Sequence, residues 1–153
     1  MMRIAALVLT LVCVGSVASA QGSRVPMPAS PSIPVDWRLL GQLDFEKGIA
    51  PDTLKKLDGK RVSVPGFIVP LDDADEIGAE FLLVPYYGAC VHTPPPPPNQ
   101  MAFVRMAGGK QIKLALFDAV WMEGTLRIVN YDSPYGSVGF TIEGQSMRPY
   151  TGK

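Results

Sequence analysis

Histidine and cysteine are almost absent from this chain. Its 153 residues contain one histidine, His92, and two cysteines, Cys13 and Cys90. Cys13 lies within the first 20 residues, so residues 21–153 have a single cysteine, which cannot form an internal disulfide. Cys90 must therefore be buried, metal-bound, reactive or bridged to another chain. This short set of options makes it the most informative residue in the sequence.

An excess of either charge is also lacking. The chain has 14 Lys and Arg against 14 Asp and Glu, with no basic run. This balance provides no electrostatic basis for binding nucleic acid or anionic lipid, so we expect no nucleic-acid partner. The phosphate-binding loop, the Gly-x-Ser-x-Gly elbow and the dinucleotide fingerprint are absent too. The acidic run at 72–76 lacks the ligand spacing of a calcium-binding hand.

Apolar runs long enough to cross a membrane are missing as well. The longest run, Ile4–Val14, follows Arg3 and precedes Ala18-Ser19-Ala20, which is the pattern of a Sec-type signal peptide. We therefore predict a signal peptide at 1–20, cleavage after Ala20, and a periplasmic mature protein without a transmembrane segment. An uncleaved anchor is the alternative. Val12 argues against lipidation at Cys13, because a lipobox requires a small residue there.

The rest of the chain is the length of one domain. Removing 20 of 153 residues leaves 133. Residues 21–34 are rich in Pro, Ser and Gly and are predicted to form a flexible linker, with a single domain at 35–153. Asp36 is placed to cap a short helix that carries Trp37 and Leu40, and 50–57 reads as a second short helical turn.

After Gly59 the hydrophobic pattern changes to the alternation of β-strands. Gly66 and Gly124 lie inside such segments, where glycine favours a bulge or a sharp bend. Gly108 belongs to a predicted turn at 107–110, after which we expect 111–117 to pair with the strand before it. Strands are predicted at 61–69, 80–87, 101–106, 111–117, 120–128 and 139–142, the last continuing as far as 147.

Short strands with glycine bends suggest a mainly β fold, a small five- or six-stranded barrel with one or two short N-terminal helices. A small β-sandwich is the alternative. The run Leu57-x-Gly59-Lys60-x-Val62-x-Val64-x-Gly66 resembles the opening strand of oligonucleotide/oligosaccharide-binding barrels.

The segment 81–100 reads FLLVPYYGACVHTPPPPPNQ, an unusual composition. A strand that ends in Pro-Tyr-aromatic-Gly-Ala-Cys runs through Cys-x-His into prolines closed by Asn-Gln. This resembles the signature of an uncharacterised family of small exported bacterial proteins, a domain-of-unknown-function family, and the resemblance covers about 35–150. It implies one exported domain and carries no activity.

Cys90 and His92 stand two residues apart, and they are the only thiol and imidazole of the mature chain. In an extended segment such residues point the same way with their Cα atoms roughly 6–7 Å apart, so both can reach one ion. Thiolate and imidazole together suit zinc or copper. Because two ligands do not complete a site, the others must come from water, a second molecule or a nearby side chain. The candidate side chains are Asp72, Asp73, Asp75, Glu76 and, for copper, Met101.

Two other interpretations of the pair stay open. Cys90 can be a small buried apolar residue with His92 as a structural hydrogen-bond donor. Alternatively, Cys90 can be a reactive thiol with His92 as its base and Asn99 orienting the imidazole.

The run Pro94–Pro98 predicts a stiff polyproline II segment without backbone donors. It can act as a strap between two strands, or as a ridge that docks on a partner protein. In the second case the partner-binding residues are Tyr86, Tyr87, Pro94, Pro95, Pro96, Pro97, Pro98, Asn99 and Gln100.

Three hypotheses for function follow. The first is a non-enzymatic periplasmic accessory or binding protein with a Cys-x-His site for zinc or copper. The second is an adaptor that docks on a membrane-associated transport or export system through its proline-rich loop. The third is a cysteine-dependent enzyme.

Overall fold

The computed structural model describes residues 31–72, 76–89, 94–133 and 136–151. The predicted signal peptide at 1–20 lies outside the described residues, as does most of the predicted linker. Asp73, Asp75, Cys90 and His92 lie outside them too. Ile33–Pro34 at the end of the predicted linker form the first strand, β1, which pairs in parallel with Val62 and Ser63.

Two short helices precede the main strands, as predicted. Helix α1 covers Trp37–Leu40, and the Asp36 side chain accepts a hydrogen bond of 2.8 Å from the Leu39 backbone N–H, which caps the helix. Helix α2 covers Asp52–Lys55 and buries Leu54. No helix among the described residues has the length and apolar character needed to span a membrane.

Most of the described chain is extended. The remaining elements, in chain order, are strands β2 (Arg61–Pro70), β3 (Ile77–Gly78) and β4 (Glu80–Val84), the 3₁₀ turn η1 (Pro98–Gln100), strand β5 (Ala102–Met106), the 3₁₀ turn η2 (Ala107–Gly109), and strands β6 (Ile112–Lys113), β7 (Ala119–Ser133) and β8 (Gly136–Pro149).

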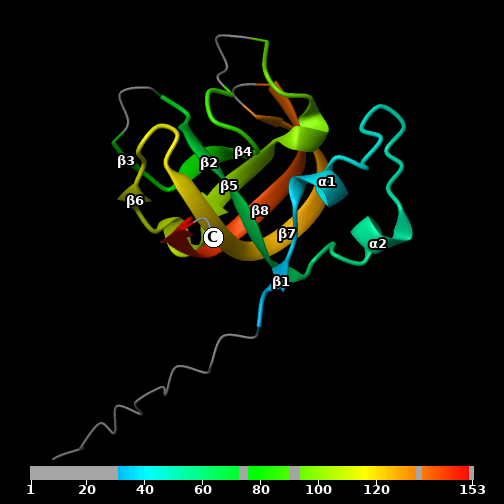
Figure 1. Cartoon of the computed structure of the whole chain (residues 1–153), viewed down its shortest axis with the longest axis horizontal. Helices are drawn as coiled ribbons and strands as arrows, with labels where there is room; N and C mark the ends of the chain where they lie inside the picture. Colours follow the sequence, from blue (N-terminus) through cyan, green and yellow to red (C-terminus); the bar gives the residue numbers. More distant parts are fainter. Residues whose placement is uncertain (1–30, 73–75, 90–93, 134–135, 152–153) are drawn as a thin grey trace, which may run out of the picture.

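Five of the strands close into a barrel (Figure 1). Strand β2 pairs with β4, β4 with β5, β5 with β8, β8 with β7, and β7 returns to β2. The β5–β8 pairing is parallel, whereas the other four are antiparallel. This order is that of an oligonucleotide/oligosaccharide-binding barrel, so the predicted fold class is confirmed.

Alternate residues of the strands separate into two apolar clusters. The larger one fills the barrel and includes Val64, Phe81, Leu83, Val104 and Phe140, all nearly inaccessible to solvent. The residues between them face outward. Five of these, on β2, β4, β5 and β8, form a second layer together with Ala89 and Met101, which lie outside the strands. We call this layer the outer cluster; its buried members are Val69, Leu82, Val84, Ala89, Met101, Phe103 and Val138.

The two glycines with predicted bends behave differently. At Gly124 the β7–β8 register shifts, as a bulge requires. Around Gly66 the β2–β7 register is continuous, and β2 acquires β4 as a partner from Phe67 onward. Gly66 is instead required for close packing, because a Cβ there would stand 2.7 Å from the Leu83 Cγ atom.

The prediction that 111–117 pairs with 101–106 is wrong. Only Ile112–Lys113 is a strand in that segment, and it pairs with the short β3. Strand β5 pairs instead with β4 and with β8, so both of its edges are occupied. The glycines of the 107–109 turn carry the chain away from β5, with Gly108 and Gly109 at φ of 66° and 68°.

Candidate functional site

The chain turns sharply where the signature segment leaves β4. Strand β4 ends at Val84, and Pro85 follows without a ladder donor. Tyr86 and Tyr87 are 51% and 73% exposed, whereas Ala89, just before Cys90, is 5% exposed and belongs to the outer cluster. The segment therefore presents two tyrosines to solvent and then returns to the barrel surface.

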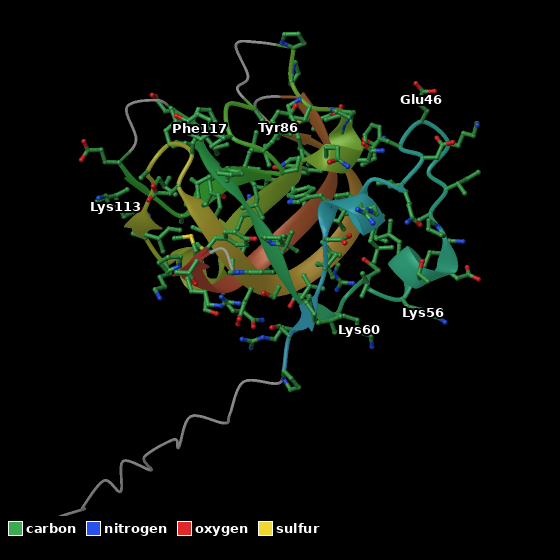
Figure 2. The ribbon with its side chains drawn as sticks, viewed as in Figure 1. Glu46, Lys56, Lys60, Tyr86, Lys113 and Phe117 are labelled. Atoms are coloured by element: carbon green, nitrogen blue, oxygen red, sulfur yellow. The ribbon has the colours of Figure 1, made fainter. Side chains whose placement is uncertain are left out.

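Tyr87 lies against an aromatic residue held in an unusual backbone conformation. Its ring centroid is 4.9 Å from that of Phe117 and 6.2 Å from that of Phe67. Phe117 has a φ of 62°, which is costly for a bulky side chain. Its N–H donates to the Ile68 carbonyl at 2.8 Å, and the Ile68 N–H donates to the Asp118 carbonyl at 3.1 Å. Figure 2 shows Tyr86 and Phe117 at the same end of the barrel.

The other end of the signature segment is tied to α1 (Figure 1). The Asn99 side-chain amide donates to the carbonyls of Gly41 at 3.0 Å and Leu43 at 2.9 Å. The Gln100 amide donates to the Trp37 carbonyl at 3.2 Å. These donors are used within the chain, which favours the strap interpretation for 98–100.

The prolines before this anchor are extended and mostly exposed. Pro97 has φ −61° and ψ 154°, which are polyproline II values. Pro96 is buried, whereas Pro94, Pro95 and Pro97 face solvent. The run therefore has one buried ring, Pro96, and the exposed rings of Pro94, Pro95 and Pro97 remain available to a partner.

The described candidates for completing a metal site differ in burial. Asp72 and Glu76 are exposed, whereas Met101 is 3% exposed within the outer cluster. Among the described residues, no three His, Cys, Asp or Glu side chains are grouped so that they can hold an ion. Leu71, Ala89 and Met101 all contribute to the outer cluster, however. Three of the segments that carry candidate ligands therefore meet at the same layer.

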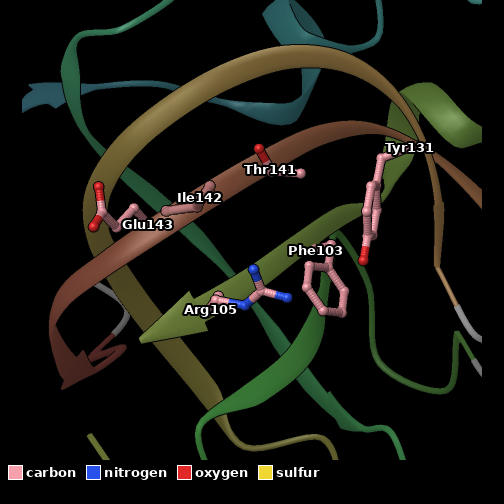
Figure 3. Close-up of a pocket in the computed structure, with 6 residues that line it drawn as sticks. All are labelled: Phe103, Arg105, Tyr131, Thr141, Ile142 and Glu143. Atoms are coloured by element: carbon pink, nitrogen blue, oxygen red, sulfur yellow. The ribbon is translucent and has the colours of Figure 1, made fainter. Parts of the chain in front are cut away.

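A groove lies on the outside of the barrel, and sequence reasoning missed it as a site (Figure 3). It has a volume of about 270 Å³, and the β5–β8 register brings most of its residues together. Phe103 lies opposite Thr141, and Arg105 lies opposite Glu143. Tyr131 of β7 completes it, with its ring centroid 5.1 Å from that of Phe103.

Arg105 is the charged centre of the groove. Its Nε donates to the Glu80 Oε1 atom at 2.6 Å, and the guanidinium carbon lies 5.8 Å from the Phe103 ring centroid. The hydrogen bond and the charge of Glu80 raise the pKa of Arg105 above its ordinary value. Arg105 is thus held as a cation beside an aromatic ring.

Only part of this groove is visible in the sequence. The two-residue spacing of Phe103 and Arg105 places them on one face of a strand. The contributions of Tyr131, Thr141 and Glu143 depend on the parallel β5–β8 pairing and on β7, which no local pattern indicates.

Comparison with known protein families and solved structures identifies the family of this chain. Residues 45–149 match a family described as "Protein of unknown function (DUF3299)". The crystal structure of a DUF3299 family protein from Pseudomonas aeruginosa PAO1 is 30% identical, with a TM-score of 0.62, and the match covers 80% of this chain and 99% of that one. No curated protein matches the chain.

Two less similar structures are aspartyl-tRNA synthetases. A putative one from Leishmania major Friedlin is 13% identical with a TM-score of 0.41, and the match covers 83% of this chain and 22% of that one. One from Entamoeba histolytica is 12% identical with a TM-score of 0.33, at 70% and 23% coverage. The family match and the Pseudomonas structure confirm the predicted membership in an uncharacterised family: this chain belongs to the DUF3299 family of proteins of unknown function.

Proposed function

We propose that the mature chain is a periplasmic accessory or binding protein that holds a zinc or copper ion through Cys90 and His92. The observation that carries the proposal is the meeting of Leu71, Ala89 and Met101 in the outer cluster. Leu71 precedes Asp72, and Ala89 precedes Cys90. Candidate ligands distant in sequence thus start from one layer of the barrel.

Both flanks of the Cys-x-His segment are anchored. Ala89 is packed in the outer cluster, and its N–H donates to the Tyr86 carbonyl at 3.4 Å. On the other side, Asn99 and Gln100 bind the backbone of α1 and of the turn after it. Fixed flanks reduce the conformational entropy that a ligand pair loses when an ion binds.

The third ligand decides between the two metals. A thioether is a soft ligand that selects Cu(I), and Met101 is buried in the outer cluster, to which Ala89 also belongs. A carboxylate suits zinc, and of the two described carboxylate candidates, Asp72 and Glu76, Asp72 directly follows Leu71 of the same layer. Both ions therefore stay in the proposal, and substituting each candidate third ligand shows which ion the site binds.

Export is part of the proposal. The signal pattern at 1–20 predicts that the protein reaches an oxidising compartment. There, a bound metal would protect the single thiol from forming intermolecular disulfides. N-terminal sequencing of the exported form should begin at Gln21, and a mature chain that retains Met1 would contradict this part.

The test is metal binding by mature protein taken from the periplasm. Elemental analysis should find up to one zinc or copper per chain, and both Cys90→Ser and His92→Ala should abolish binding while the domain stays folded. Binding should weaken as the pH falls, because protons compete for the thiolate and the imidazole.

Met101→Leu should remove Cu(I) binding only, and Asp72→Asn should weaken zinc binding only. Met106→Leu, inside the barrel, is the matched control.

Calorimetry on reduced protein can contradict the metal site. If neither ion binds at micromolar concentration, or if Cys90→Ser unfolds the domain, Cys90 is a core residue and the metal site is wrong.

A docking adaptor for a membrane-associated transport or export system is the second candidate. It is supported by the exposure of Tyr86, Tyr87 and three prolines of the signature segment. In this role the prolines and tyrosines would contact the partner, and Asn99 and Gln100 would hold the loop in place. A Tyr86→Ser, Tyr87→Ser double variant should then lose a periplasmic partner that the wild-type protein captures, with metal binding unchanged.

A further inference from the structure

A polar row and an aromatic pair define the groove on the outside of β5, β7 and β8. Glu80, Arg105 and Glu143 are directly opposite one another on the adjacent strands β4, β5 and β8. In the next row Phe103 lies opposite Thr141. Residues two apart on a strand face the same way, so the two rows share one surface.

Two packed aromatic rings form one side of the groove. Phe103 is 3% exposed, and its ring is tilted by 41° from the Tyr131 ring at a centroid distance of 5.1 Å. Tyr131 is partly exposed and stands at the groove edge (Figure 3). A pair of packed rings supplies an apolar wall whose side chains lose little freedom when a ligand arrives.

The charged side of the groove is partly ordered in advance. The Arg105 side chain is 64% exposed, yet Glu80 at 2.6 Å and the Phe103 ring hold its guanidinium. A guanidinium has five N–H donors in a planar fork, and one bond to Glu80 leaves others for a ligand. Glu143 is exposed and adds a carboxylate acceptor opposite it.

The net charge of the polar row determines the class of ligand. Two carboxylates and one guanidinium leave the row with one negative charge, which disfavours phosphate and hence nucleic acid. The groove volume of about 270 Å³ suits a single ring-sized group rather than a large cofactor.

A sugar ring combines the features that this groove matches. Its C–H face packs on an aromatic ring, and the hydroxyls around its rim both donate and accept hydrogen bonds. We propose that the groove binds one ring of an uncharged oligosaccharide, with the ring against Tyr131 and its hydroxyls bonded to Arg105, Thr141 and Glu143. None of the residues that line this groove is a candidate metal ligand, so the groove can bind a saccharide whether or not the chain binds metal.

The test is an NMR titration of the ¹⁵N-labelled mature protein with chitotriose, cellotriose and maltotriose at millimolar concentration. At least one of these should give saturable shift changes centred on the amides of 103–105, 131 and 141–143. Glu143→Gln and Arg105→Lys should each weaken that binding by about tenfold or more. Both positions are exposed on the barrel surface, so the variants should fold.

Arg148→Ala is the matched control. Arg148 also stacks on an aromatic ring, with its guanidinium carbon 5.0 Å from the Trp121 centroid, and it also faces a glutamate, Glu123, at 3.9 Å. It lies outside the groove, so saccharide affinity should not change.

Three results would overturn the proposal: no shift with any of the three saccharides, saccharide binding that survives both groove variants, or groove shifts with an oligothymidylate or a lysine peptide but with no saccharide.

Discussion

Gly124 and Gly144 face each other across β7 and β8, and each is buried. The atoms that a methyl group would meet at the two positions differ in kind. At Gly124 it would meet the Glu143 carbonyl oxygen and the Ile142 Cγ2 atom, the latter at 2.7 Å. At Gly144 it would meet the Met106 Sδ and Met122 Cε atoms at 2.7 and 2.9 Å, which are ends of flexible side chains.

We expect Gly124→Ala to be the more destabilising change. A backbone oxygen at the bulge cannot withdraw without breaking the β7–β8 ladder, so the cost should be about 3 kcal/mol. Gly144→Ala should cost about 1 kcal/mol or less, because the methionines can shift. Urea unfolding of both variants measures the difference. Equal losses at the two positions would show that the bulge itself can relax.

Among the elements, the segment 94–100 leads into β5 and is hydrogen-bonded to α1 and to the turn that follows it. Its anchor is Asn99, whose amide nitrogen faces two backbone carbonyls. In Cys-His-Asn enzymes the asparagine orients the histidine, whereas here the amide N–H groups are bound to Gly41 and Leu43. The contacts of Asn99 thus provide a structural role for the residue that sequence reasoning considered for catalysis.

Replacing this donor by a carboxylate of nearly equal size should unfasten the segment. We expect Asn99→Asp to lower the free energy of unfolding by about 1–3 kcal/mol at neutral pH, because a charged acceptor would face two carbonyl acceptors. Asn130→Asp makes the same chemical change at an exposed site of β7 and should have little effect.

The pH dependence of Asn99→Asp follows from the same contacts. The carbonyls favour the protonated carboxyl, so its folded-state pKa should rise above the unfolded value. The variant should therefore recover stability as the pH falls and lose it as the pH rises through the raised pKa. Unfolding midpoints of wild type and variant at several pH values test this; a deficit that stays constant with pH would contradict it.

For the whole molecule, stability should be concentrated in the closed ring of β2, β4, β5, β8 and β7. Each of these strands pairs on both sides and contributes to the buried interior. The β3–β6 sheet lies outside the ring and has two residues per strand, and Ile77 in it is 64% exposed.

Native-state hydrogen exchange should show this division. Interior amides of the ring strands are expected to exchange together, through global unfolding, whereas the β3–β6 amides should exchange about a hundredfold faster or more through local opening. Equal protection of the two sheets would mean that β3 and β6 belong to the same cooperative unit as the barrel.

The chain's own pattern was enough to predict the two short helices and the five strands of the barrel, but not the short strands β1 and β3. The alternation at the start of 61–69 indicated a strand because alternate residues such as Val62 and Val64 are buried in the barrel. The strand predicted at 80–87 is present at Glu80–Val84, where residues of both faces are buried. Asp36 indicated the start of α1 because its side chain can satisfy a helix N–H without help from other elements. The rarity of Cys90 and His92 identified the Cys-x-His segment, and the signature residues identified the family.

Tertiary structure alone decided which strands are neighbours. Alternation shows that a strand has a buried face, but it does not name the partner, so β5 could pair in parallel with the distant β8 rather than with 111–117. Everything that depends on neighbours followed from that choice: the closed ring, the outer cluster that joins Leu71, Ala89 and Met101, and the groove that places Arg105 opposite Glu143. Strand alternation and helix caps depend on residues close together in the sequence, so one segment is enough to predict them. A site assembled from several strands depends on their register, which forms only when the barrel folds.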